Sequence, residues 1–213
     1  MLIQYHKFIT RKALSEQFSP RALEAILAAN LNQDNLLTGQ IGHDEYHYDN
    51  NAIPESDRYI EDQRTLTHTA LQNDTPSTAW AAFGRLTHTA QDFYAHSNYV
   101  DLWLAHSNGG DQTLPPSSEI APLIGELVHS PNLHSGVLYY PWEILAFLPV
   151  VKCFVIPFMP ADSHARMQLD SPARGERFAY AFEAAVKRTR YEFDKTVADL
   201  SPSLEALFTD QSF

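Results

Sequence analysis

The chain has 213 residues, of which 44% are hydrophobic and 19% are charged, the proportions of an ordinary soluble, folded protein. Its formal charge of −11 argues against a broad nucleic-acid surface, which would need many Lys and Arg side chains, although bound divalent cations would cancel part of that charge. The one cysteine, Cys153, excludes an internal disulfide. We expect a single domain spanning residues 1–213, long enough to bury one core.

The amino-terminal sequence MLIQYHKFITRKAL contains no long apolar stretch and no small-residue cleavage site. It therefore does not resemble a secretory signal, and we expect a cytoplasmic protein. His6 lies at the start of the first predicted helix. A short second helix follows, with Leu23, Ile26 and Leu27 on its apolar face.

Four dipeptides predict helix starts, because each pairs an N-cap residue with a proline at the first helical position. They are Ser19-Pro20, Thr75-Pro76, Ser171-Pro172 and Ser201-Pro202. Strand signals are nearly absent, since no sustained period-two alternation and no Asn-Gly or Asp-Gly turn occurs. We predict an all-α fold, with long connections at about 32–54 and 98–171 that are typical of functional loops.

The first long connection is dense in groups that bind cations. The segment His43-Asp44-Glu45-Tyr46-His47-Tyr48-Asp49 lies in it, and Asp34 lies upstream where the second helix should end. Zinc favours imidazole and carboxylate ligands, and iron shares such shells as the less favoured alternative. His43 and Glu45 are the nearest rivals for ligand roles here.

A helix predicted over residues 80–103 carries His88, Asp92 and His96 at successive four-residue steps. These positions spread over only about 80° of the helix circumference, so the three side chains project toward one point. Apolar Trp80 and Phe83 run beside them, which places the polar stripe in the interior, where a cation would satisfy it. The alternative is an exposed contact between residues four apart.

Residues 139–159 form the longest apolar run, interrupted by Lys152 and by prolines at 141, 149 and 157. These interruptions argue against a membrane-spanning helix. The run predicts a hydrophobic loop or broken helix that lines a pocket or makes peripheral contact with a membrane. Packing into the core is the open alternative.

The carboxy-terminal region predicts one long helix with an apolar face. Its positions are Phe178, Phe182, Ala185, Thr189, Phe193 and Val197. On the opposite side, Glu183 and Lys187 are spaced four residues apart and predict an exposed ion pair.

Together these motifs amount to a family resemblance. The sequence HTAQDFYAHSNYV, preceded by TPSTAWAAFGRL, resembles the heterokaryon-incompatibility protein C type, a branch of the zinc-dependent phospholipase C and single-strand nuclease superfamily. His6 in HKFITRKAL, Asp34 after an Ala-Asn pair and the tetrad His47 to Asn50 fit the same order. The downstream matches are Leu133-His134-Ser135-Gly136, Lys152-Cys153 and His164 followed by Leu169-Asp170-Ser171.

The resemblance implies a multi-helix phospholipase C/nuclease-like fold with long functional loops and up to three zinc ions. The first ion would be held by Asp34, His47, His88 and Asp92. The second would be held by His96, His164 and an acid that the family places four positions after the histidine. Because that position is Gln168 here, we assign Asp170 instead. The third would be held by His6, a bridging Asp92, and the terminal amine and carbonyl of Met1.

The implied activity is phosphoester hydrolysis by metal-activated water, phospholipase C-like, with Asp34 binding metal and accepting the proton of the water. The substrate would be a phospholipid or a phosphorylated small molecule. A single-strand nuclease-like phosphodiesterase is an alternative, less favoured by the charge, in which bases would stack on Tyr94, Tyr99, Trp103 or Trp142. The other alternative is a non-catalytic lipid-binding or assembly module with an incomplete metal cluster. Gln168, which stands where the family has an acidic ligand, and the lack of a secretory-signal pattern favour this alternative.

Overall fold

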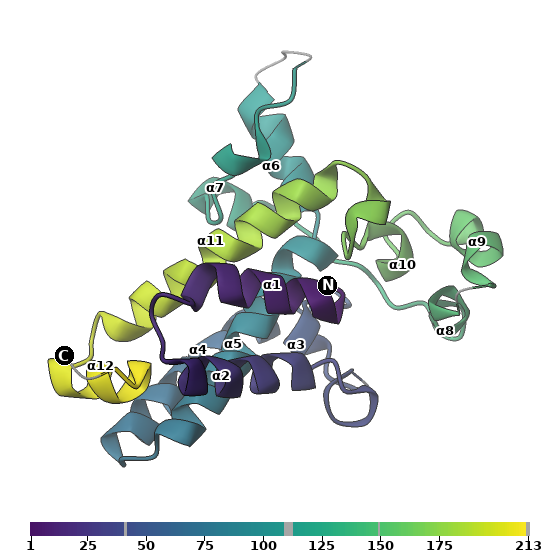
Figure 1. Cartoon of the computed structure of the whole chain (residues 1–213). Helices are drawn as coiled ribbons and strands as arrows, with labels where there is room; N and C mark the ends of the chain where they lie inside the picture. The colour runs from purple at the N-terminus through teal and green to yellow at the C-terminus, as the bar shows by residue number, and fades with distance from the viewer. Residues whose placement is uncertain (41, 109–112, 149, 212–213) are drawn as a thin grey trace.

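The computed structural model describes residues 1–40, 42–108, 113–148 and 150–211. The fold is all-α, as predicted (Figure 1). Its α-helices are α1 (Ile3–Leu14), α2 (Pro20–Asn32), α3 (Asp44–His47), α4 (Ile53–Gln72), α5 (Pro76–His96), α6 (Tyr99–Asn108), α7 (Gly125–Val128), α8 (Trp142–Phe147), α9 (Lys152–Val155), α10 (His164–Met167), α11 (Arg177–Val197) and α12 (Pro202–Thr209). Short turns of other helix types are η1 (Leu36–Gln40), η2 (Ser117–Glu119), η3 (Ile156–Phe158) and η4 (Pro172–Arg174).

Helix α5 forms the centre of the fold, where it packs against α2, α4 and α11 (Figure 1). Every residue from Leu86 to His96 is buried, so this half of the helix has no solvent-facing side. Gly84 permits the close approach of α2, because a Cβ atom there would lie 2.4 Å from the carbonyl oxygen of Ile26. The polar stripe of the helix is therefore inside the protein, and the exposed alternative is wrong.

The helix predicted over 80–103 is interrupted, because α5 ends at His96 and α6 begins at Tyr99. Ser97 has extended backbone angles, φ −106° and ψ 168°. Its hydroxyl donates to the carbonyl of Phe93 and accepts from the amide of Tyr99. Because the helix stops there, the carbonyl of His96 is free to accept the amide of Gly136 at 2.9 Å.

Three of the four predicted helix starts are confirmed, since α2, α5 and α12 each begin at the proline. The side chains of Ser19 and Ser201 cap their helices by accepting backbone amides of the first turn. The prediction at Ser171-Pro172 is wrong for an α-helix. Only the three-residue turn η4 forms, and Gly175, with φ 90°, follows it.

Helix α11 confirms the predicted carboxy-terminal helix. Phe178, Ala185, Thr189 and Phe193 are buried, while Phe182 and Val197 are half-buried against the core. The predicted Glu183–Lys187 pair is wrong, because both groups find partners on other segments. Glu183 accepts from Lys12 Nζ at 2.7 Å, and Lys187 donates to two carbonyls of the 118–120 loop.

Segment 139–159, of which residue 149 lies outside the described residues, is the predicted broken helix. It forms α8, α9 and η3, and it packs around its own small cluster of Ala146, Met159 and Ala165. Core packing is wrong for most of the segment, since many of its apolar side chains are exposed. None of the described helices is long and apolar enough to cross a bilayer.

Candidate metal centre

The predicted ligands converge beside the last turns of α5. The ligands come from α1, α3, α5 and α10 and from the segment that follows α2. Asp170 joins them from the loop after α10. Three groups of side chains have ligand atoms within 4.8 Å of one another and could hold a metal ion: His6, His88 and Asp92; Asp34, His47 and His88; and Asp49, His96 and His164.

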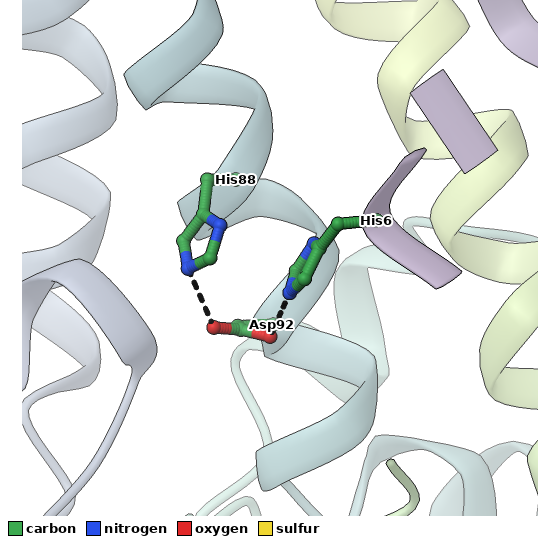
Figure 2. A group of neighbouring side chains, drawn as sticks. All are labelled: His6, His88 and Asp92. Atoms are coloured by element: carbon green, nitrogen blue, oxygen red, sulfur yellow. Dashed lines mark ion pairs between the residues drawn. The ribbon is translucent and has the colours of Figure 1, made fainter. Parts of the chain in front are cut away.

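Asp92 lies at the middle of this centre, and each of its oxygens faces a different pair of nitrogens. Oδ1 accepts from the Met1 amine at 2.5 Å and lies 3.2 Å from His6 Nε2. Oδ2 lies 2.9 Å from His47 Nδ1 and 3.1 Å from His88 Nε2. Figure 2 shows His6 and His88 approaching the two oxygens from opposite sides. Asp92 thus places one oxygen on each side of the centre.

Four of the imidazoles are held by one ring nitrogen and turn the other toward the carboxylates. Such outer hydrogen bonds are typical of metal-binding histidines, because they fix the tautomer and the orientation of the ring. The outer bonds run from His6 Nδ1 to Gln91 Oε1 (2.7 Å), His47 Nε2 to the Gly39 carbonyl (3.3 Å), His96 Nδ1 to the His47 carbonyl (2.9 Å) and His164 Nδ1 to Glu143 Oε1 (3.1 Å).

The outer bond of His47 has a direct chemical consequence. Because its Nε2 donates to a carbonyl, the neutral ring presents a lone pair at Nδ1, 2.9 Å from a carboxylate oxygen of Asp92. Two acceptors at that distance need a positive charge between them or on the ring. A proton or a metal ion satisfies this requirement.

Several buried ligand atoms of the centre have no hydrogen-bond partner. Burying an oxygen or nitrogen in this way is unfavourable unless another group, such as a cation, satisfies it. The atoms are His6 Nε2, Asp34 Oδ2, Asp49 Oδ1 and Asp170 Oδ1, of which all but Asp34 Oδ2 lie 3.2–3.3 Å from an ionisable group of the centre. The donor set and its unpaired atoms therefore fit a bound metal ion.

Electrostatics inside the centre separate neutral from charged groups. Burial and the neighbouring His6 lower the pKa of His88 to about 4, so this ring is neutral at pH 7, as a ligand must be. Burial would raise the pKa of Asp92, but the Met1 amine and nearby histidines hold it well below its usual range. Burial would likewise lower the pKa of the Met1 amine, yet Asp170 and Asp92 raise it to about 11.

The structure adds one residue to the second predicted ligand set. The structure groups His96 and His164 with Asp49, which we had not assigned as a ligand. Asp170 instead lies 3.3 Å from both His96 Nε2 and the Met1 amine, between that group and the amino terminus. Asp49 had a sequence signal, because it belongs to the His-aromatic-Asp-Asn tetrad.

Glu143 is the other site residue that the sequence did not single out. It is fully buried, although it lies in the apolar segment 139–159, and its Oε1 lies 3.1 Å from His164 Nδ1. The sequence did offer one indication, because Glu143 is the only acidic residue between positions 139 and 159. A lone carboxylate in an apolar segment needs a specific partner.

Residues 134–138, which we call the crosspiece, join the segments that carry the second half of the centre. Gly136 is required there, because a Cβ atom would lie 2.5 Å from the Cα of His164. Isolated β-bridges link Ser97 to Ser135 and Val137 to Ser163. Backbone bonds run from the Gly136 amide to the His96 carbonyl (2.9 Å), from the Asn50 amide to the Gly136 carbonyl (2.8 Å) and from the His164 amide to the Val137 carbonyl (2.9 Å).

The rival ligands His43 and Glu45 do not belong to the three groups. They lie 3.2 Å from each other, and each side chain is about a third exposed. The His43 ring also stacks on Tyr46. These contacts account for both residues as a surface pair outside the metal centre.

Comparison with known proteins assigns the chain to a family. Residues 4–123, more than half of the chain, match the model of the VWA7 N-terminal domain. This range contains the ligands from His6 to His96, whereas Glu143, His164 and Asp170 lie beyond it. The chain matches no curated protein and no solved structure. The chain belongs to the VWA7 N-terminal domain family.

Proposed function

We propose that this protein is a zinc-dependent phosphoester hydrolase of the phospholipase C type. The observation that supports the proposal best is the inward orientation of the anchored imidazoles around Asp92. His6, His47 and His96 each hold a fixed partner with the outer ring nitrogen and turn the inner one toward a carboxylate of the centre. Mixed imidazole and carboxylate donors favour zinc, with iron as the less favoured ion.

The three groups of side chains define which residues would hold up to three zinc ions. Asp92 would serve two of them, since its oxygens face opposite sides of the centre. The Met1 amine and Asp170 lie where they would complete the set near His96. The chemistry that bound zinc supplies is Lewis acidity and activation of water at neutral pH.

Asp34 suits the role of proton acceptor. Its side chain is only 9% exposed, and Gln40 Nε2 donates to its Oδ1 at 3.3 Å, which leaves Oδ2 without a hydrogen bond. Oδ1 also lies 3.8 Å from His88 Nε2, so the carboxylate is at the edge of the centre. A carboxylate held by one oxygen and open at the other can orient a water and take its proton.

Among the substrates, a phospholipid or another phosphorylated small molecule is favoured over single-stranded nucleic acid. Three of the four aromatic residues that we considered for base stacking, Tyr94, Tyr99 and Trp103, are buried in the core. Only Trp142 is exposed, at 59%. A nuclease needs accessible rings for successive bases, so the nuclease alternative loses most of its candidates.

The test combines elemental analysis of the purified protein with two water-soluble substrates, bis(p-nitrophenyl) phosphate and p-nitrophenyl phosphorylcholine. Asp92→Asn keeps the shape of the side chain but removes its charge, so we expect it to lose bound zinc and roughly 100-fold or more in kcat/KM. Asp101→Asn is the matched control, because Asp101 is exposed and pairs with Arg177.

Two or three zinc equivalents in the wild type, with hydrolysis that Asp92→Asn abolishes, support the proposal. Zinc content of one equivalent or none, with no hydrolysis of either substrate after zinc addition, refutes it and favours the non-catalytic binding module. An unchanged metal content in Asp92→Asn would remove the bridging role of that residue.

A further inference from the structure

Residues 139–159, which we call the apolar arm, expose an unusual amount of large hydrophobic surface. Phe158 is 89% exposed, Val150 79% and Phe154 72%. Tyr140, Trp142, Ile144 and Leu148 are exposed as well, each by 46% or more. A contiguous segment with this many exposed apolar side chains marks an interaction site rather than ordinary surface.

The arm stands apart from the main core. Its few buried side chains pack around Ala146, Met159 and Ala165, a cluster separate from the core that surrounds α5. Helices α8 and α9 project beside α10, away from the α1, α2 and α5 bundle (Figure 1). The exposed side chains are distributed over α8, α9, η3 and the connection between them rather than along one helical stripe.

The charge pattern of the arm suits a lipid surface. Among its described residues the charged side chains are Lys152, which is exposed, and Glu143, which is buried and points to His164. The arm thus exposes no carboxylate, whereas the whole chain carries a formal charge of −11. That overall charge opposes an anionic membrane, so the apolar side chains favour a bilayer of zwitterionic lipid.

We propose that the apolar arm inserts into the surface of a zwitterionic phospholipid bilayer and holds the metal centre against it. Glu143 gives the arm a direct connection to that centre, because the residues on either side of it, Trp142 and Ile144, are exposed while its own side chain reaches His164. This inference rests on the proposed function for its choice of lipid as partner, so binding is measured separately from hydrolysis.

Trp142 is a built-in reporter of insertion. The other two tryptophans, Trp80 and Trp103, are 5% and 4% exposed, so a polarity change at the arm dominates any change in emission. With phosphatidylcholine vesicles we expect a blue shift and quenching by brominated acyl chains, both absent in Trp142→Phe. Replacing a third of the lipid with phosphatidylserine at low salt should weaken binding.

Phe158→Ser and Phe154→Ser test the arm by vesicle co-sedimentation. Both side chains are mostly exposed, and we expect each variant to bind phosphatidylcholine vesicles roughly tenfold more weakly. The matched control is Phe8→Ser on α1, where a phenylalanine is 57% exposed far along the sequence from the arm. Its vesicle binding should equal that of the wild type.

Equal loss in the Phe8 control, or no loss in the arm variants, overturns the proposal. A monomer–dimer equilibrium in light scattering that the arm variants abolish also overturns it, because the arm then binds a second copy of this chain. Vesicle binding by a wild type that hydrolyses neither water-soluble substrate supports insertion and refutes the proposed function. Hydrolysis of those substrates without vesicle binding supports the proposed function and refutes insertion of the arm.

Discussion

The two halves of the metal centre are held in different ways. In the first half, His6, His88 and Asp92 lie on the long helices α1 and α5 inside the main core. In the second half, His96 is the last residue of α5, while Asp49 and His164 lie on a loop and on the four-residue helix α10. The crosspiece joins these segments to the end of α5 by backbone hydrogen bonds. Core packing therefore positions the first half, whereas the backbone hydrogen bonds of the crosspiece position the second.

This difference also follows the family match. Residues 4–123 include the whole first half and, of the second half, Asp49 and His96, but they end before the crosspiece, Glu143 and His164. A set of ligands on packed helices tolerates variation in the loops, whereas a loop-held set depends on each connecting bond. We therefore expect substitutions in the two halves to affect metal binding differently.

The largest effect should come from His88→Ala in the helix-held half. His88 belongs to two of the three groups, with Nε2 3.1 Å from Asp92 and 3.8 Å from Asp34. Removing a shared ligand should lower kcat/KM by more than the roughly 10–100-fold typical of outer partners and should release more than one zinc equivalent. His68→Ala is the control, because His68 bonds only the Thr196 carbonyl among the contacts described. Equal zinc content in both variants would contradict the shared role.

Gly136→Ala should damage the loop-held half alone. The added Cβ meets the backbone of His164, so that segment has to move, with a loss of about 1–3 kcal/mol in the free energy of unfolding. We expect the zinc content to fall by one equivalent while the His6, His88 and Asp92 group keeps its ion. Gly125→Ala is the matched control, since a Cβ there meets nothing within 4 Å. Loss of all zinc in Gly136→Ala would show that the two halves do not bind independently.

Glu143→Gln should have a smaller effect, because it changes only the outer partner of His164. The amide oxygen of glutamine still accepts a hydrogen bond, but the ring loses a charged partner and becomes a weaker donor to metal. We expect roughly tenfold weaker binding of one zinc ion in a chelator competition titration. Glu126→Gln, a change at an exposed glutamate on α7, should leave the titration unchanged. An equal affinity in both variants would leave Glu143 without a role in the centre.

The helix-held half was predictable from the sequence because helical periodicity brings ligands four residues apart to one face. His88 and Asp92 follow that rule, as does His96, which lies on the same helix but belongs to the other half, and their burial follows from the apolar residues around them. The end of the helix at Ser97 did not follow, since it depends on a side-chain bond to Phe93 and on pairing with the distant Ser135. Local pattern therefore predicted the ligands but not the helix boundary.

The loop-held half was predictable only in part. His164 and Asp170 were identified through the family resemblance, but the grouping of Asp49 with His164 depends on backbone bonds between segments more than 80 residues apart along the chain. No periodicity encodes such contacts. The same limit applies to Tyr94 and Tyr99, which the sequence left available for stacking and the fold buries in the core.

The smallest expected effect is a proton release that accompanies zinc binding. Burial alone would lower the pKa of His96, but the Asp92 and Asp49 carboxylates outweigh it and raise this pKa well above 6.5. The pKa of His47 is raised too, because burial, the largest single effect, is outweighed by the hydrogen bond to Asp92 together with the charges of Asp92 and Asp49. The His96 ring therefore carries a proton at pH 7 before metal binds, and zinc has to displace it. Calorimetric titrations at pH 7 in two buffers of different ionisation enthalpy should show release of at least one proton per chain.

Zinc affinity should fall as the pH falls, because more protons must then be displaced. Binding heats that do not depend on the buffer would contradict this account, and His96→Asn, which cannot carry the proton, should reduce the release.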